Sequence, residues 1–322
     1  ILCSLLAARL YYLRYEEIAL FPSVCSGIET AVLNTPIARG QNVVLIAEQF
    51  PSNVYPWTSA AQRADAEVRF ATRDEQTLTD SVLKCIDSNT AAVSIPAVHW
   101  TDGEKVDLVA VRDATRRHGA HLVLDLTQSL GAMPFALDRI DPDFAVAAGY
   151  KWLLGPYASA YLYVAPRHCD GRPLENNWIT RARAERFSEL VRYTDALAPG
   201  ARRFDVGERS NFVTLPMCEA ALSQLLQWGI EPLYAHLTEM TDRIAQRAAP
   251  FGYRARSLAE RGGHYLGLTG GQVPPEQLAQ FLREQRVWVS VRGDSIRVTP
   301  HLYTSEDDID RFLNALEQAA ST

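Results

Sequence analysis

Lysine is scarce in this chain, and one lysine lies where an amine could do chemistry. Lys84, Lys105 and Lys151 are the only lysines among 32 basic residues. Lys151 is also the sole charged residue in the stretch 144–166, FAVAAGYKWLLGPYASAYLYVAP. A desolvated lysine loses its proton readily and can form a Schiff base with an aldehyde. The alternative is a lysine at a strand end that reaches solvent along its own methylenes.

Polar residues follow several of the expected strands. Asp125 comes directly after the apolar residues 121–124, and a carboxylate there needs a cation such as a protonated pyridine nitrogen, or else it is the N-cap of a following helix. Gln128 can donate to a phenolate oxygen. His99 follows another strand, as a substrate-side acid or as a structural histidine. Because ligands bind at the carboxyl ends of strands in open parallel sheets, we expect these groups to converge.

Two further segments could hold a flat, phosphorylated ligand. Ser26 and Gly27 open a helix, where free amides and the helix dipole favour a phosphate, although many serines at such places only cap the helix. Phe50 follows the strand expected at 43–47 and can cover a planar ring, with ordinary core packing as the alternative.

Strand-like runs alternate with helical periods through the first two thirds of the chain, which predicts an α/β fold with a mostly parallel sheet. A poorly periodic, arginine-rich excursion follows, and the tail predicts a small α+β domain. The expected strands are 43–47, 91–95, 121–126, 143–148 and 158–164, the expected helices are 27–36, 77–86, 105–118, 216–228, 231–248 and 306–319, and the excursion is 167–211.

Composition limits the function. The 322 residues, 47% hydrophobic and 22% charged, suffice for two unequal domains. A net charge of -6 argues against nucleic acid and favours a small polar substrate. We find no membrane-spanning run and no signal peptide, and so expect a cytoplasmic protein without a membrane partner. Five cysteines without a CxxC pair argue against a disulfide scaffold and a zinc site, and we expect no metal.

Several motifs, in this order, resemble the class V aminotransferase family of pyridoxal-phosphate enzymes, particularly its kynureninase-like and isopenicillin-epimerase-like members. The motifs are FPSNVY (50–55), DLTQS (125–129), GYKW (149–152), RFDVGERSNF (203–212) and IRVTPHLYTSEDDID (296–310). The resemblance implies a fold-type I large domain, with helices on both faces of a mostly parallel, seven-stranded type of sheet. We place that domain at 16–235 and a small α+β domain at 1–15 and 236–322. It also implies a homodimer with its active sites at the interface.

The resemblance assigns roles residue by residue. Lys151 resembles the lysine that holds pyridoxal 5'-phosphate, Asp125 the partner of the pyridinium nitrogen, and Gln128 the donor to the phenolic oxygen. Phe50 resembles the aromatic residue that stacks on the ring. The cofactor phosphate is assigned to Tyr150, Ser26 and Gly27, the substrate carboxylate to Arg297, and a reach into the active site to Ser210 and Asn211.

Three departures restrict the reaction. The residues before Arg297 contain no nucleophilic cysteine, which argues against persulfide chemistry, and Asn53 replaces an acid that kynureninases carry. Relatives have several tens of residues ahead of the segment around Ser26, so we expect an arm that is missing or that lies outside this sequence.

We therefore expect an enzyme that acts on a small amino acid as a transaminase or β-lyase. The alternatives are an amino-acid epimerase and a non-catalytic relative that keeps the fold. A nucleotide-binding α/β enzyme is disfavoured, because the chain contains neither a GxGxxG after its first strands nor a GxxxxGK[ST].

Overall fold

The computed structural model describes residues 2–11, 14–73 and 75–321, and these form two compact units. The sheet unit comprises Ile1–Ala97, Val106–Gly131 and Phe135–Gln227, and the C-terminal unit comprises Val98–Lys105, Ala132–Pro134 and Trp228–Thr322. This division differs from the expected one at the N-terminus, because helix α1 (Leu2–Tyr11) belongs to the sheet unit. The Ser4 hydroxyl there accepts a hydrogen bond from Arg202 at 3.1 Å.

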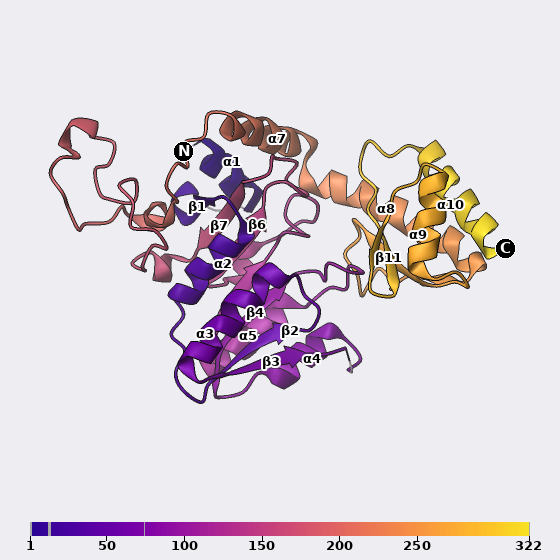
Figure 1. Ribbon diagram of the computed structural model, residues 1–322, viewed down its shortest axis with the longest axis horizontal. Helices are drawn as coiled ribbons and strands as arrows, with labels where there is room; N and C mark the ends of the chain where they lie inside the picture. The colour runs from indigo at the N-terminus through magenta and orange to yellow at the C-terminus, as the bar shows by residue number, and fades with distance from the viewer. Residues whose placement is uncertain (1, 12–13, 74, 322) are drawn as a thin grey trace. The chain divides into compact units, whose positions relative to one another are not determined.

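A seven-stranded sheet forms the centre of the sheet unit, in the order β1-β7-β6-β5-β4-β2-β3 (Figure 1). Strand β7 is antiparallel to both of its neighbours, whereas β6, β5, β4, β2 and β3 pair in parallel. The strands are β1 (Ile18–Phe21), β2 (Asn42–Ile46), β3 (Glu67–Ala71), β4 (Thr90–Pro96), β5 (His121–Asp125), β6 (Phe144–Ala148) and β7 (Ala160–Val164). The mostly parallel sheet is therefore confirmed. The sequence did not reveal β1, which has only four residues, or β3, which is half-exposed at the sheet edge.

Helices cover this sheet and end where the sequence supplies caps. Helix α2 packs on one face of the sheet, where Ile28 and Trp57 share a buried core with Val146 of β6. Helix α5 begins after Asp107, whose carboxylate accepts from two backbone amides, and ends at Gly119 with a φ of 69°, as expected. The other helices of the unit are α3 (Tyr55–Ala64), α4 (Leu78–Cys85), α6 (Leu137–Ile140) and α7 (Thr214–Trp228), beside α2 (Val24–Leu33) and α5 (Leu108–His118).

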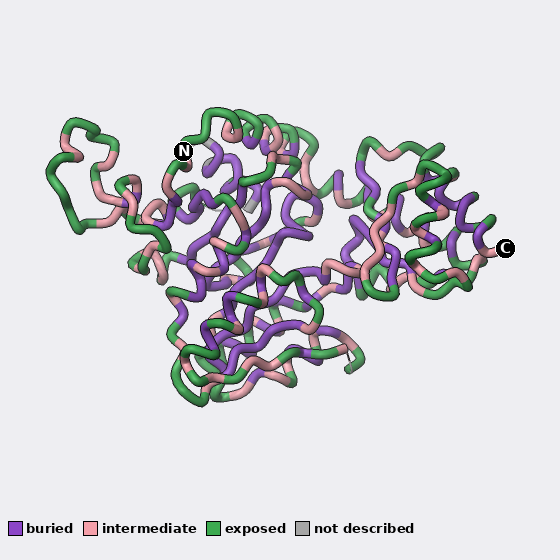
Figure 2. Tube along the Cα trace, viewed as in Figure 1, coloured by how far each residue is buried: buried purple, intermediate pink, exposed green. Residues whose placement is uncertain are grey.

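The expected excursion lies between β7 and α7. Its described residues contain only short 3-10 helices, at Pro166–His168, Phe187–Glu189 and Gly200–Phe204. Most of it is exposed or half-buried (Figure 2), including apolar side chains such as Val191 and Tyr193. This long exposed segment matches the prediction for 167–211.

The C-terminal unit is an α+β domain, as predicted. Its antiparallel sheet has the order β10-β11-β9-β8. The strands are β8 (Tyr253–Arg254), β9 (Leu266–Gly270), β10 (Ser290–Arg292) and β11 (Ser295–Val298), and the helices are α8 (Ile230–Ala248), α9 (Pro275–Glu284) and α10 (Glu306–Ala320). Helix α9 was not predicted. In neither unit does a described helix have the length and apolar character needed to cross a membrane.

Candidate functional site at the carboxyl edge of the large sheet

Asp125 is the last residue of β5 and pairs with Pro96 on one side and Val146 on the other. Its Oδ1 accepts a hydrogen bond from the Thr127 backbone amide at 3.0 Å, and only 7% of the residue is exposed. Burial raises the pKa of the Asp125 carboxyl, while the hydrogen bonds from Thr127 and the charge of Lys151 act in the opposite direction. Turns rather than a helix follow Asp125, so the helix-capping interpretation is wrong. A carboxylate buried here is stabilised by a cation.

Lys151 supplies an amine at the same edge of the sheet. It lies three residues beyond the end of β6, and its Nζ lies 4.9 Å from the centroid of the Phe50 ring. The ring of Tyr150 is 5.9 Å from the same atom. Lys151 is half-buried, so the amine lies against aromatic faces that favour a cation instead of extending fully into solvent.

The loop that carries Lys151 is closed by backbone hydrogen bonds. The Gly149 amide donates to the Ser159 carbonyl and the Gly155 amide donates to the Gly149 carbonyl, both at 2.7 Å. Tyr150 stacks on Tyr157 with ring centroids 4.1 Å apart. These contacts restrict the directions in which Lys151 can point.

Gln128 follows Asp125 within one buried turn. Its Oε1 accepts a hydrogen bond from the Trp152 indole at 3.1 Å, and 8% of the residue is exposed. The Ala148 amide, at the end of β6, donates to the Thr127 hydroxyl at 3.2 Å. The turn after β5 is thereby joined to the segment that leads to Lys151.

Ser26 and Gly27 lie in the first turn of α2. The Ser26 amide donates to the Ser23 hydroxyl at 3.2 Å, so the capping interpretation holds for Ser23. A Cβ at Gly27 would lie 2.7 Å from Val146 Cγ2, which means that only glycine permits this approach of α2 to β6. The start of α2 is thus held against the strand that leads to Lys151, and the phosphate role of Ser26 and Gly27 stays a prediction.

His99 and Arg297 belong to the C-terminal unit, so their part in a site with Lys151 stays a prediction. His99 is fully buried, with its Nδ1 2.7 Å from the Thr101 hydroxyl, while its carbonyl accepts from the Tyr265 hydroxyl. These contacts match the structural interpretation of this histidine.

Arg297 lies on β11 and donates from Nη1 to the Trp100 carbonyl at 2.9 Å. Its Nε is buried without a hydrogen-bond partner among the described residues. Burial, with the nearby Arg292 charge, lowers the pKa of the Arg297 guanidinium. A buried donor without a partner favours an anionic ligand.

Asn211 is exposed and caps α7. Its Oδ1 accepts from the backbone amides of Val213 and Thr214 at 2.9 and 3.0 Å. The adjacent Ser210 is also exposed. This capping role accounts for Asn211 within its own chain, and its reach into an active site stays a prediction.

A buried amide cluster that the sequence analysis missed supports Phe50. Asn53 is 1% exposed, its Oδ1 accepts from the Ser94 hydroxyl at 2.6 Å, and its Nδ2 donates to Gln49 Oε1 at 3.2 Å. The Asn53 amide also donates to the Phe50 carbonyl. Asn53 therefore anchors the segment beside the ring. In the sequence, only the polar character of Gln49, Asn53 and Ser94 could have indicated this cluster.

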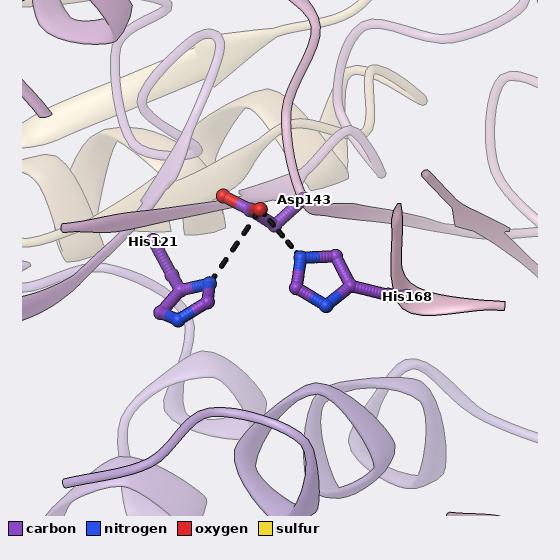
Figure 3. A group of neighbouring side chains, drawn as sticks. All are labelled: His121, Asp143 and His168. Atoms are coloured by element: carbon purple, nitrogen blue, oxygen red, sulfur yellow. Dashed lines mark hydrogen bonds and ion pairs between the residues drawn. The ribbon is translucent and has the colours of Figure 1, made fainter. Parts of the chain in front are cut away.

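A second cluster lies at the start of β5, the opposite end of that strand from Asp125. His121, Asp143 and His168 bring their ligand atoms within 4.8 Å of one another, as a metal site would (Figure 3). Asp143 Oδ1 lies 2.6 Å from His168 Nε2 and 3.5 Å from His121 Nδ1. However, Arg167 Nε donates to the same oxygen at 2.8 Å, and the Leu122 amide donates to Oδ2 at 2.7 Å. A permanent cation on that oxygen opposes a metal ion, so we interpret the cluster as an ion-pair network that fastens β5, β6 and β7.

The family model described as aminotransferase class-V matches residues 16–312. The uncharacterized aminotransferase YcbU of Bacillus subtilis is 26% identical over 95% of this chain and 80% of that protein. The kynureninase of Deinococcus radiodurans is 34% identical over 66% of this chain and 50% of its own length, and that of Bacillus cereus is 26% identical over 77% and 61%. The chain therefore spans about half to three fifths of these two kynureninases.

Solved structures show the same fold. An apo cysteine desulfurase from Thermococcus onnurineus has a TM-score of 0.85 at 18% identity and covers 99% of this chain and 83% of its own. The cystine C-S lyase C-DES, in complex with cysteine persulfide, has a TM-score of 0.87 at 19% identity, over 98% and 85%. The fold is that of the fold-type I enzymes, as expected. With a family model that matches nearly its whole length, this chain belongs to the class V aminotransferase family.

Proposed function

We propose that this chain is a pyridoxal 5'-phosphate enzyme that acts on a small amino acid, as a transaminase or β-lyase. One observation carries the proposal: the half-buried Lys151 lies over the Phe50 ring, at the same sheet edge as the buried Asp125, and its charge acts to lower the pKa of that carboxyl. An amine and a buried carboxylate at one sheet edge suit an aldehyde on a basic heterocycle. Membership of the class V family supports it independently.

The residues of the sheet unit fit the cofactor. Burial raises the pKa of Asp125, and a protonated pyridine nitrogen would favour its ionised form. Phe50 is 36% exposed, and Lys151 Nζ lies over its ring. The start of α2, at Ser26 and Gly27, suits a phosphate group because its amides and dipole attract anions.

When bound, the cofactor supplies an electron sink for the substrate's α-carbon. Asp125 would hold the ring nitrogen protonated, and Lys151 would hold the cofactor and, after the substrate amine has displaced it, would move the proton at Cα. Gln128 would donate to the phenolic oxygen, Phe50 would cover the ring, and Tyr150 would help to hold the phosphate.

The remaining roles concern the substrate. Arg297 binds the α-carboxylate, since a planar guanidinium with a buried Nε that has no partner among the described residues suits a two-oxygen anion. His99 and Asn211 are the remaining candidates. A homodimer would bring the exposed excursion against a second copy, as the exposed Val191 and Tyr193 suggest. A cytoplasmic location stays a prediction.

Absorption spectroscopy tests the proposal. With added pyridoxal phosphate, the purified protein should develop a visible band, and borohydride should fix the cofactor on the peptide that contains Lys151. Lys151→Ala should lose both the band and turnover. Lys84→Ala is the matched control, because Lys84 is 72% exposed and pairs with Glu75. A Lys151→Ala protein that still carries a reducible band would refute the assignment.

A panel of amino acids then separates the alternatives. Ketoacid with amino-group transfer identifies a transaminase, and ammonia with loss of a β-substituent identifies a lyase. Inversion of the substrate without either product identifies an epimerase. A visible band that no amino acid perturbs would identify a non-catalytic relative.

A further inference from the structure

The residue after Lys151 makes a hydrogen bond that fixes the orientation of a side-chain amide. The indole Nε1 of Trp152 donates to Oε1 of Gln128 at 3.1 Å, across 24 residues of sequence. Both side chains are buried, and each residue is 8% exposed. An indole N–H can donate but never accept, so only the oxygen of the amide can face it.

This bond determines which end of Gln128 faces the other way. Because Oε1 is turned to the indole, the amide nitrogen Nε2 is turned away from it. A flipped amide would place its N–H groups against the indole N–H, and a buried hydrogen bond would be lost.

The backbones that carry the two side chains also touch. A Cβ at Gly131 would lie 2.5 Å from the Trp152 carbonyl oxygen, and Gly131 has a φ of 91°. The turn after β5 therefore packs directly against the loop that holds Lys151. The hydrogen bond from the Ala148 amide to the Thr127 hydroxyl joins the same two segments. The indole and the amide thus lie on two segments that pack against each other.

We propose that Trp152 is a positioning residue, whose indole N–H orients Gln128 so that Nε2 donates to the phenolate oxygen of the bound cofactor. This inference rests on the proposed function. A hydrogen bond to a phenolate stabilises its charged form and lowers the pKa of the group that shares its proton. Loss of the orientation should therefore raise the pH at which the visible band titrates.

The test compares two tryptophan variants after loading with pyridoxal phosphate. Trp152→Phe removes the donor but keeps an aromatic ring, and should raise the midpoint of the visible pH titration by about half to one unit. Trp57→Phe is the matched control, because Trp57 is fully buried in the same unit and its indole N–H has no hydrogen-bond partner among the described residues. Its midpoint should equal that of the wild type.

A double-mutant cycle separates positioning from a general structural effect. Gln128→Ala should raise the midpoint at least as far as Trp152→Phe does, and Trp152→Phe should add nothing in that background. If Trp152→Phe does not fold, 3-benzothienylalanine at position 152 replaces the N–H by sulfur at nearly constant shape and should give the same shift.

Two results would overturn the inference. A wild-type midpoint in Trp152→Phe, with a raised one in Gln128→Ala, would show that Gln128 donates without help and would leave the proposed function intact. Equal, additive shifts in the cycle would likewise exclude positioning through Gln128. Failure of the wild type to form any visible band with pyridoxal phosphate would instead refute the proposed function, and this inference with it.

Discussion

Replacing Asp143 by asparagine should loosen the sheet unit while leaving the candidate site chemically intact. Asp143 Oδ1 accepts from His168 and Arg167 at 2.6 and 2.8 Å, and Oδ2 accepts from the Leu122 amide at 2.7 Å. An asparagine offers one accepting oxygen, so at least one buried donor would face an NH2 group. Such a donor costs about 1–3 kcal/mol.

The Arg167 ion pair adds little to this cost. Arg167 is 42% exposed and keeps a second partner, Asp141, so solvent screening limits that part to about 0–1 kcal/mol. We therefore expect Asp143→Asn to lower the free energy of unfolding by about 1–4 kcal/mol at pH 7. Urea titration, monitored by circular dichroism, measures this change in the free energy of unfolding.

The same carboxylate gives the sign of the pH dependence. Burial raises the pKa of Asp143, but hydrogen bonds from His121, His168, Arg167 and the Leu122 amide outweigh burial and hold the pKa well below its usual range. A lowered pKa in the folded state adds stability above the unfolded value of about 4, and this stability is lost as the pH falls below it. Asp143→Asn should therefore lose less stability than the wild type between pH 5 and pH 3. These two pH values lie about one unit above and below the carboxyl pKa of the unfolded chain.

Asp141→Asn is the matched control. Asp141 also pairs with Arg167, at 2.7 Å, but its side chain is 36% exposed. Its loss should cost no more than about 1 kcal/mol. Equal losses in the two variants, or a wild-type pH dependence in Asp143→Asn, would refute the argument from burial.

Two further substitutions test the candidate site. Asp125→Asn should keep the visible band, because Lys151 remains. It should lower kcat about 100- to 1000-fold, since a neutral amide no longer holds the ring nitrogen protonated. Steady-state kinetics with an amino acid that the wild type converts measures this loss, and an unchanged kcat would contradict it. Arg297→Lys should raise KM for that amino acid about tenfold or more, because one ammonium replaces a planar, two-pronged donor. The matching amine without a carboxylate is the control, and an equal rise in its KM would exclude carboxylate binding by Arg297.

Most of the sheet unit could be predicted from the amino-acid pattern of single segments. Apolar runs marked β2, β4, β6 and β7 because these strands are buried along their whole length, and β5 because it is buried from Leu122 onward. Asp125 and Lys151 were predictable as neighbours, because the residues that follow adjacent parallel strands meet at the same edge. Gly119 likewise predicted the end of α5, because glycine readily adopts the left-handed conformation that it has there.

The side chains that support Asp125 and Lys151 could not be predicted from the sequence, because their contacts depend on the tertiary structure. Asn53 appeared in the sequence as a possible substrate determinant, but it is buried and bonded to Ser94, 41 residues away. In the sequence, Trp152 was only part of a motif. Its hydrogen bond to Gln128 forms because the loop that carries Trp152 packs against Gly131, in the turn after β5. Periodicity reports burial on one element at a time, whereas hydrogen bonds between distant segments form only when packing brings their donors and acceptors to about 3 Å.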